Sequence, residues 1–446
     1  MKTSHLALAL LLALCTAPVI GCSSDEDNNT NTNVPSDKPG ELTRSVKSDK
    51  ARVDSKISDA DLKVFVKGQY DLNYDILRKS GDDIAKKNAM ISTYSIQTAL
   101  AMVWAGADGE TASEMQKALN FGDHAHEALN KLDKTIMALN REAHDDEMYY
   151  SDPIEIKTSN NLYLAPDYKW ASEWLDALAI NYGAGITEMN FAADPEKARE
   201  YINQVVSNDT HERIQDLIPE DGINAQTKSV ITNAIYFKAP WSGEVSKKND
   251  KLDFSKFDGS KIQVDALGDS GHFPYIKDVD YQAVVMSLRE DLFEVMFILP
   301  DEGKFDSVMA SMNGEIVLGI FDSLTRDTKI YLTFPTYEFT TELSLSDTLK
   351  SLGMVKAFSA AADFSKMTET PNELLISDVR HKSFIGVDEK GIEAAAATAV
   401  MVQPGSAEMP EEPIDLILDR PFMFIIYETQ THTPLFVGHV MDPSAK

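Results

Sequence analysis

Residues 387–405, near the C-terminal end of the chain, constrain its fold most because they suit two different conformations. They read VDEKGIEAAAATAVMVQPG, and the four consecutive alanines after Glu393 favour a helix. Counted with a period of two, however, one face is mostly apolar and small to medium in size. That face consists of Ile392, Ala394, Ala396, Thr398, Val400 and Val402. Such a face suits a strand that enters a tight slot between other strands, and no proline interrupts residues 392–403.

The overall composition limits the class of protein. The chain has 446 residues, of which 43% are hydrophobic, so it is long enough to bury a large core. Its formal net charge is −29, and a surface of this kind repels phosphate backbones and anionic headgroups. We therefore expect no nucleic-acid partner; the alternative interpretation is that the acidity serves solubility alone.

The N-terminus has the features of an export signal. Lys2 is followed by an apolar run over residues 6–14 that is too short to span a bilayer, so residues 1–21 are interpreted as a signal peptide. Residues 19–22 (VIGC) resemble a bacterial lipobox, in which cleavage before Cys22 exposes the thiol for lipidation. The alternative is an ordinary signal peptide with a chance cysteine. Since Cys15 leaves with the signal, the mature chain contains no disulfide.

Residues 22–53 are polar and include an acidic run directly after Cys22. Such a segment buries too little apolar surface to fold, so we predict a flexible tether before a single folded domain over residues 54–446. The acidic run resembles the surface-export signal of Bacteroidetes lipoproteins. That resemblance implies an outer-membrane lipoprotein whose folded domain is exposed outside the cell and held to the membrane by its lipid.

The rest of the chain mixes helical and strand-like segments around one core, with no internal repeat. Apolar residues at helical spacing predict helices over residues 61–79, 95–106, 111–119, 125–139, 170–182 and 195–207. Apolar runs, many of them β-branched or aromatic, predict strands over residues 154–164, 230–237, 282–288, 292–299, 330–334, 374–387, 414–418, 422–428 and 435–440. Helices dominate the first half and strands the second, which indicates the α+β class.

Two patterns look chemical but lack partners. Residues 268–272 (GDSGH) resemble the sequence around the nucleophile of trypsin-like proteases, yet no matching histidine context occurs upstream of Ser270. We therefore interpret these residues as a turn rich in glycine and aspartate. His124 and His126 point apart on a helix, and no third ligand follows at metal spacing. The chain also has no glycine-rich phosphate loop, so neither an enzyme nor a cofactor or metal is expected.

Several motifs, in order, resemble the serpin family. Residues 387–398 resemble the hinge of inhibitory serpins, and residues 232–238 with Trp241 resemble the third strand of sheet A and the breach tryptophan. The other matching stretches are residues 92–101, 363–368, 420–424 and 434–443. The resemblance covers residues 54–443. It implies an α+β serpin fold with three β-sheets, eight or nine helices and a reactive-centre loop, about residues 389–413, held outside a five-stranded sheet A.

The resemblance also assigns roles to residues. The reactive-loop hinge consists of Glu389, Gly391, Ile392, Glu393, Ala394, Ala395, Ala396, Ala397 and Thr398. The shutter, a polar cluster under sheet A, consists of Ser92, Ser95, Asn233 and His381, and Trp241 stands at the breach.

Three departures from the family pattern bear on these roles. Thr93 replaces the usual shutter proline, which leaves the shutter geometry open. Thr336 stands where the lysine partner of Glu389 is usual, so that ion pair is not expected. Ile392 is larger than the usual first inserting residue, which implies slower initial insertion.

The implied function is suicide inhibition, in which a protease cleaves the loop and is trapped as the loop inserts into sheet A. Counting from the hinge places the scissile bond at Gly405–Ser406, whereas counting back from Arg420 places it near Pro410. Ala407 and Met409 lie between and favour elastase-like or broad-specificity targets. No arginine or lysine lies between Gly391 and Arg420, which argues against trypsin-like targets. The expectation is a monomer that traps serine proteases and also papain-like cysteine proteases; the alternative is a non-inhibitory, cell-surface binding protein of the same fold.

Overall fold

The structure, a computed structural model, describes residues 42–145, 150–369, 374–393 and 412–446. These residues belong to one compact unit, Ser36–Lys446. Among them, no helix combines the length and apolar character needed to cross a bilayer. The predicted signal peptide and the lipidation site Cys22 lie outside the described residues.

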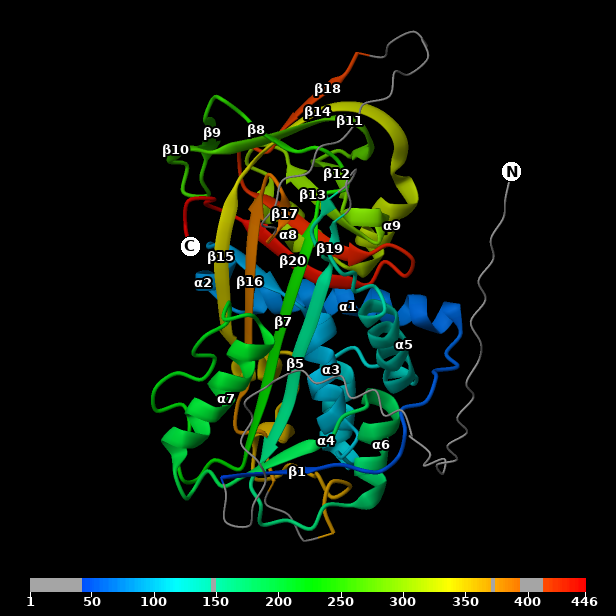
Figure 1. Cartoon of the computed structure of the whole chain (residues 1–446), viewed down its shortest axis with the longest axis vertical. Coiled ribbons are helices and arrows are strands. Elements are labelled where there is room, and N and C mark those ends of the chain that lie inside the picture. Colours follow the sequence, from blue (N-terminus) through cyan, green and yellow to red (C-terminus); the bar gives the residue numbers. More distant parts are fainter. Residues whose placement is uncertain (1–41, 146–149, 370–373, 394–411) are drawn as a thin grey trace, which may run out of the picture. The chain divides into compact units, whose positions relative to one another are not determined.

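The first of two large sheets, sheet A, has seven strands in the order β1-β6-β5-β7-β17-β16-β15 (Figure 1). Its strands are β1 (Thr43–Val46), β5 (Glu155–Leu164), β6 (Ile186–Met189), β7 (Ser229–Pro240), β15 (Tyr337–Ser344), β16 (Val379–Asp388) and β17 (Gly391–Ile392). β7 is buried along nearly its whole length, as expected for a strand covered on both faces. Five strands match the predicted five-stranded sheet, and the short β1 and β17 are additional.

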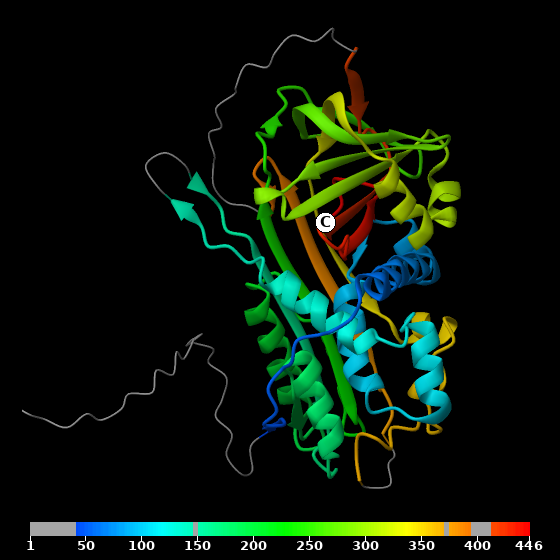
Figure 2. The same cartoon turned by 90° about the vertical axis from the view of Figure 1, so that its right-hand side faces the viewer.

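The centre of sheet A is the pair β7 and β16, which run side by side in Figure 2, β7 in green and β16 in orange. The two strands are parallel and paired from Val379–Ile231 to Ser383–Ile235. Beyond that ladder β17 lies between them and pairs with both. A strand can therefore enter sheet A only by separating β7 from β16.

The second large sheet has nine strands: eight form one path that bends at β11, and β8 lies off this path and pairs with β11. β11 pairs with β14 over most of its length and with β12 only at its end, so it belongs to two smaller sheets. Counted this way, the three predicted sheets are present. The nine strands are β2 (Ala89–Ile91), β8 (Ser246–Lys247), β11 (Ala266–Lys277), β12 (Tyr281–Ser287), β13 (Phe293–Pro300), β14 (Thr325–Pro335), β18 (Ile414–Ile417), β19 (Phe422–Glu428) and β20 (Pro434–Val440). Short pairs join β3 (His144–Asp145) to β4 (Tyr150–Ser151) and β9 (Leu252–Ser255) to β10 (Lys261–Val264).

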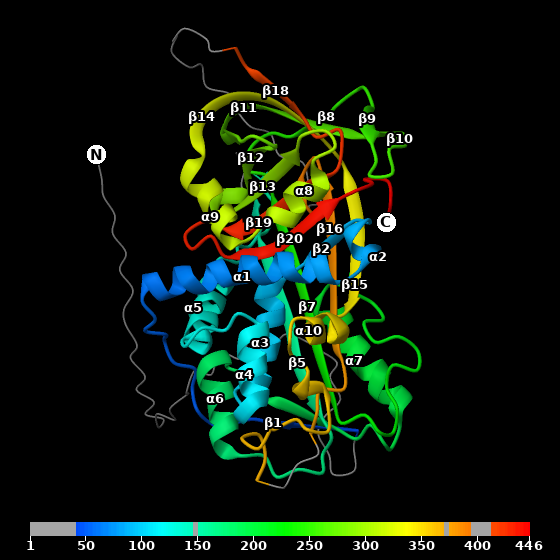
Figure 3. The ribbon, with the colours of Figure 1, turned by 180° about the vertical axis from the view of Figure 1, so that it is seen from behind.

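The described residues form ten α-helices, or nine without the single-turn α2, in agreement with the prediction. They are α1 (Asp59–Lys79), α2 (Asp82–Ala85), α3 (Thr93–Trp104), α4 (Gly109–Ala118), α5 (Ala125–Met137), α6 (Ser172–Tyr182), α7 (Pro195–Asp209), α8 (Phe305–Ser311), α9 (Gly314–Ser323) and α10 (Ser346–Ser351). α7 covers one face of sheet A in Figure 1, and α1 and α3 lie on the opposite side in Figure 3. The six helices predicted from spacing are therefore confirmed, to within a few residues at their ends.

Local signals explain why these helices begin where they do. The hydroxyl of Ser58 accepts a hydrogen bond from the Asp61 N–H and caps α1, whose first turn is acidic and whose last turn is basic. Ser92 caps α3 in the same way, with its side chain accepting from the Ser95 N–H. This cap places Ser92 and Ser95 directly beneath sheet A.

The prediction of a flexible tether up to residue 53 is wrong at its C-terminal end. β1 adds to the edge of sheet A, antiparallel to β6, and its Arg44 forms an ion pair with the buried Glu188 at 2.6 Å. Arg52 donates a hydrogen bond to Asn130 at 3.0 Å and pairs with Asp133 at 2.5 Å. Polar residues are ordered here because backbone pairing and ion pairs replace the apolar burial that the segment lacks.

Two strand assignments also differ from the sequence prediction. Residues 268–272 lie inside β11 rather than in a turn, since each of them pairs with a residue of β14. The strand predicted over residues 374–387 begins only at Val379 and ends at Asp388. Glycine and aspartate adopt a strand conformation here because the long neighbouring strand β14 pairs with each residue of the segment.

Candidate functional site

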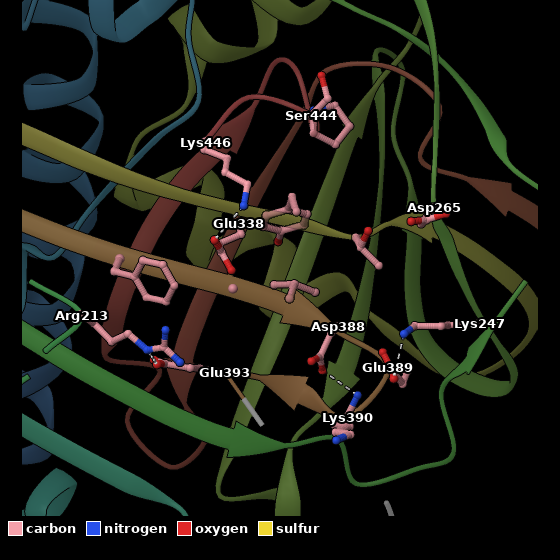
Figure 4. Close-up of a pocket in the computed structure, with 16 residues that line it drawn as sticks. Arg213, Lys247, Asp265, Glu338, Asp388, Glu389, Lys390, Glu393, Ser444 and Lys446 are labelled. Carbon is pink, nitrogen blue, oxygen red and sulfur yellow. Dashed lines mark hydrogen bonds and ion pairs between the residues drawn. The ribbon is translucent and has the colours of Figure 1, made fainter. Parts of the chain in front are cut away.

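The chain reverses direction at the end of β16 and returns into the sheet (Figure 4). Asp388 ends β16, and its Oδ1 accepts hydrogen bonds from the N–H groups of Lys390 at 2.8 Å and Gly391 at 3.3 Å. An aspartate bound to the backbone two residues on is a typical turn former. The turn folds β17 back between β16 and β7, where Gly391 pairs with both Asp388 and Pro240.

Gly391 is required at this point by close contact. Its φ is +152°, and a Cβ on this residue would overlap the backbone carbonyl of Ala239 and the Cα of Pro240. Any side chain would therefore separate β17 from β7. From the sequence, Gly391 is explained by the backbone freedom that a hinge needs. The structure adds a second reason, because there is no room for a side chain between β17 and β7.

Ile392 lies inside the sheet and not on a loop outside it. Its residue exposure is 3%, and it pairs with Val387 on one side and Ala239 on the other. The expectation that the loop lies wholly outside sheet A is therefore wrong for its first residues. The gap between β7 and β16 accepts the larger side chain because the direct β7–β16 ladder has already ended at Ser383.

Glu393 fixes the end of β17. Its N–H donates to the Gly386 carbonyl at 2.8 Å, and its side chain, only 9% exposed, forms an ion pair with Arg213. The Arg213 guanidinium also lies 5.3 Å from the centre of the Phe384 ring. Burial raises the pKa of Glu393 to about 7, although Arg213 and Lys238 act in the opposite direction.

Glu389 has an ion-pair partner that the sequence argument missed. Thr336 does not supply one, but Lys247 of β8 lies 3.0 Å from the carboxylate. Lys247 lies 89 residues before Thr336 in the sequence, between β7 and β11. No local pattern marks it as a partner of the hinge. The expectation that position 336 supplies no ion pair to Glu389 is therefore correct, and Lys247 of another strand takes that role.

Trp241 joins the turn to the end of β7. Its backbone N–H donates to the Lys390 carbonyl at 3.0 Å, and its Nε1–H donates to the Asp388 carbonyl at 2.9 Å. The ring is buried and packs edge-on against Phe334. Trp241 therefore connects the end of β7 to the end of β16 beside β17, and its role as the breach tryptophan stays a prediction.

An open cleft of about 630 Å³ adjoins this turn (Figure 4). Three of its cations face carboxylates of the same cleft: Arg213 pairs with Glu393, Lys247 with Glu389, and Lys446 lies 3.5 Å from Glu338. The hinge is thus tied by ion pairs to two separate segments of the chain, and the third pair joins the C-terminus to β15.

The four predicted shutter residues meet beneath the β7–β16 ladder. The Ser92 N–H donates to His381 Nε2 at 3.3 Å, so Nδ1 carries the proton and donates to Asn233 Oδ1 at 2.5 Å. Asn233 Nδ2 in turn donates to Ser95 Oγ at 2.5 Å. Burial lowers the pKa of His381 to about 3, so the ring is neutral. The predicted hydrogen-bonded cluster is present, and its control of insertion stays a prediction.

The shutter extends further than the sequence indicated. Asn160 of β5 accepts hydrogen bonds from Asn233 Nδ2 at 2.7 Å and Ser95 Oγ at 2.8 Å, and no spacing in the sequence pointed to it. Thr93, in place of the usual proline, accepts from Asn73 Nδ2 at 2.6 Å and donates to the Gln69 carbonyl at 3.3 Å. Thr93 therefore connects the cluster to α1.

His381 and Asn233 are also partners in the β16–β7 ladder. Their side-chain hydrogen bond crosses the gap that an inserted strand must open. Two features therefore lie on the same pair of strands. β17 lies between β16 and β7 at the breach, and the His381–Asn233 hydrogen bond joins the two strands below it.

Other predicted residues lie outside the described residues. They are Ala394, Ala395, Ala396, Ala397 and Thr398 of the hinge and the scissile-bond candidates Gly405, Ser406, Ala407 and Met409. Within the described ranges no group of three or more His, Cys, Asp or Glu side chains is arranged to hold a metal ion.

Comparison with known proteins agrees with this geometry. The family model described as Serpin (serine protease inhibitor) matches residues 67–443. An uncharacterised serpin-like protein of Thermococcus kodakarensis is 30% identical over 435 residues, covering 97% of this chain and 98% of that protein. Human serpin B3 is 31% identical over 379 residues, covering 80% of this chain and 94% of its own length.

Solved structures show the same fold. The native-state structure of tengpin, a thermophilic serpin, has a TM-score of 0.74 at 25% identity and covers 90% of this chain and 100% of its own. Thyroxine-binding globulin in complex with thyroxine has a TM-score of 0.71 at 24% identity, with 85% and 99% covered. With the family model matching most of the residues, these similarities show that the chain belongs to the serpin family.

Proposed function

We propose that this serpin is a protease inhibitor, not a catalytic enzyme, and that it traps extracellular serine proteases and also papain-like cysteine proteases. The protease would cleave the loop after β17 and form an acyl-enzyme. Insertion of the cleaved loop between β7 and β16 would then carry the protease away before hydrolysis is complete. Elastase-like or broad-specificity proteases are the proposed targets.

The observation that carries the proposal is the position of β17. Gly391 and Ile392 already pair with both central strands, and this is the position from which an inserting strand would continue. The next residues in sequence carry a small face with no proline. Further insertion would bury Val400 and Val402, at about 1.5–3 kcal/mol each, and form ladder hydrogen bonds worth about 0.5–1.5 kcal/mol each.

The test is a trapping experiment with neutrophil elastase and papain. The wild-type protein should give an SDS-stable complex, and cleavage of its loop should raise the melting temperature strongly. Ala396→Pro should convert it to a substrate, because proline removes a ladder donor in a central strand. Ala396→Ser, which keeps a small side chain and the donor, is the matched control. Quantitative cleavage with neither a complex nor a stabilised product would refute inhibition, and mass spectrometry of the cut loop would identify the bond.

A second candidate is a non-inhibitory binding protein. The structural similarity to thyroxine-binding globulin shows that the same fold occurs in a protein solved with a bound small molecule. Loop cleavage without stabilisation would favour this candidate.

We further propose that the mature protein acts as a monomer anchored in the outer membrane through lipid on Cys22. The VIGC motif and the acidic run after it support this proposal. The mass of the N-terminal peptide and protease accessibility on intact cells test the anchor and the exposure, respectively. Cys22→Ala should release the protein from the membrane fraction.

A further inference from the structure

Four polar side chains are completely buried where α1 packs against the first turns of α3 (Figure 3). Gln69 and Asn73 belong to α1, Thr93 and Gln97 belong to α3, and the exposure of each residue is 0%. Each pair is spaced four residues apart, so its two side chains lie on one face of their helix. The two faces meet, because Asn73 Nδ2 donates to Thr93 Oγ1 at 2.6 Å and the Thr93 hydroxyl donates to the Gln69 carbonyl at 3.3 Å. We call these four residues the α1–α3 cluster.

The α1–α3 cluster contains polar atoms that the surrounding protein leaves without a hydrogen bond. They are both ends of the Gln69 amide, Asn73 Oδ1 and Gln97 Oε1. Eight buried side-chain atoms of this kind occur in the part of the chain that the structure describes, and four of them lie in this one cluster. Burying an amide without a partner is unfavourable, and buried polar groups in native proteins are normally paired with protein or with ordered water. The concentration of four such atoms at one helix contact indicates a common partner.

The chemistry of these atoms identifies the partner. Gln69 Nε2 is a donor, whereas the three oxygens of Gln69, Asn73 and Gln97 are acceptors, so the partner must both accept and donate hydrogen bonds. The orientations of two amides are fixed, since Gln97 Nε2 donates to the Leu119 carbonyl at 2.8 Å and Asn73 Nδ2 donates to the Gln69 carbonyl at 3.1 Å. No member of the cluster is charged, which argues against a bound ion. Water both donates and accepts, and three acceptors need more hydrogens than one water molecule can donate.

A surface cleft of about 540 Å³ lies directly beside the α1–α3 cluster, and its wall includes Gly68 and Asn120. Gly68 precedes Gln69 in the chain, and Asn120 follows Leu119, whose carbonyl accepts the hydrogen bond from Gln97. The two sides of the wall are joined by a hydrogen bond from Asn120 Nδ2 to the Gly68 carbonyl, at 3.3 Å. This bond is longer than usual for an N–H donor. Opening it would give water from the cleft a short path to the cluster.

We propose that the α1–α3 cluster is a binding site for ordered water molecules that Gln69, Asn73 and Gln97 share and that enter from the cleft. The water bridges α1 to α3 and adds to the direct hydrogen bonds that Thr93 makes. Because Thr93 follows Ser92 in the chain, the hydrated site adjoins the shutter and stabilises the helix end on which the shutter is built. The proposal concerns the folded protein and does not depend on the inhibitory function proposed above.

The test variant is Gln69→Met. The Gln69 side chain makes no hydrogen bond to another described residue, so the change removes no direct contact of this kind. Methionine has nearly the same length as glutamine and a similar helix propensity. Gln204→Met on α7 is the matched control, since the same change there removes an exposed hydrogen bond to Asn208. Two measurements are made: the melting temperatures, and crystal structures of wild type and Gln69→Met at a resolution that shows ordered water.

The sign of the change in melting temperature decides the question. A hydrated site loses its bridging hydrogen bonds in Gln69→Met, so the melting temperature should fall by about 1–4 °C relative to Gln204→Met. The wild-type crystal structure should show water within hydrogen-bond distance of Gln69 and Gln97, and the variant should lack it. A site without water predicts the opposite, because removing an unpartnered buried amide is stabilising. An unchanged or raised melting temperature, or a wild-type structure in which the Gln69 amide binds no water, would overturn the proposal.

A double-mutant cycle tests whether the water is shared. Gln97→Met removes Gln97 Oε1 and also the hydrogen bond to the Leu119 carbonyl, so its own effect on stability should be larger. If both glutamines bind the same water molecules, the fall in melting temperature of the double variant should be smaller than the sum of the two single falls. Additive falls would show that Gln69 and Gln97 act separately, and the shared site would then be wrong.

Discussion

The carboxylate of Glu393 and the guanidinium of Arg213 form an ion pair that joins the end of β17 to the segment after α7. The two residues are separated by 180 positions in the sequence. Arg213 thereby holds the first inserted residues of the loop inside sheet A. The hinge of this serpin is fixed by contacts from outside the loop as well as by the loop's own sequence.

Arg213→Ala should loosen the hinge. Removing the guanidinium leaves the mostly buried Glu393 carboxylate without its charged partner, at a cost of about 1–3 kcal/mol. We expect faster hydrogen exchange at the Ile392 amide and a lower melting temperature. Lys247→Ala removes the more exposed pair with Glu389 and should cost less than about 1 kcal/mol. Unchanged exchange at Ile392 in Arg213→Ala would contradict the assignment.

Hinge insertion should weaken as the pH rises. Burial raises the pKa of Glu393 from 4.5 to about 7, while a hinge released into water returns to the ordinary value. The inserted state therefore holds the proton more tightly, so its stabilisation is complete below pH 4.5 and is lost as the pH rises through 7. The groups that act on this carboxylate are Arg213 from the segment after α7, Lys238 and Tyr236 from β7, and Glu155 from β5.

The measurement for this prediction is the fluorescence of Trp241 beside the hinge, between pH 5.5 and 8, isolated by subtracting the Trp241→Phe spectrum. Glu393→Gln should abolish the transition. A transition of the same size in Glu393→Gln would assign it to another group.

Gly391→Ala should expel β17 from the sheet. A methyl group at this position would overlap the Ala239 carbonyl. Gly386→Ala on the neighbouring strand is the matched control, since its Cβ would meet only Phe384 and Glu338 side-chain atoms at 3.7–4.0 Å. Exchange at the Ile392 amide should rise in the first variant alone. Equal exchange in both variants would show that the close contact is not limiting.

Asn233→Ala should make it easier for β7 and β16 to separate in sheet A. The change removes the hydrogen bonds to His381, Ser95 and Asn160 and leaves buried polar groups unpaired, at a cost of about 2–4 kcal/mol. We expect a lower melting temperature and faster spontaneous loss of trapping activity at 37 °C. Asn208→Ala on the exposed surface of α7 is the control. Normal long-term stability in Asn233→Ala would show that the cluster does not restrain opening.

Arg44→Ala should destabilise the edge of sheet A. Glu188 is 2% exposed and would keep only the hydrogen bond from Trp170 Nε1, at 2.7 Å. The expected loss is about 1–3 kcal/mol in urea unfolding, whereas Lys50→Ala, an exposed position nearby, should have no effect. Equal stability of the two variants would mean that β1 adds nothing to the fold.

Much of the fold was predictable because its signals are local. The helical spacing of residues 61–79 and the β-branched run of residues 230–237 each report on their own neighbours. The hinge glycine and the shutter residues were identified by resemblance to a family, and the structure brings the shutter residues together. The strand at residues 268–272 was not predictable, since its ladder comes from β14, more than fifty residues later.

The sequence by itself determined that residues 387–402 suit a central strand, because side-chain size and alternation are properties of the segment alone. Only the tertiary structure decided that Gly391 and Ile392 are already inside the sheet. It also decided which side chains hold them there, namely Arg213, Lys247 and Trp241. These partners come from distant parts of the chain and are selected by packing and burial, for which no local pattern exists.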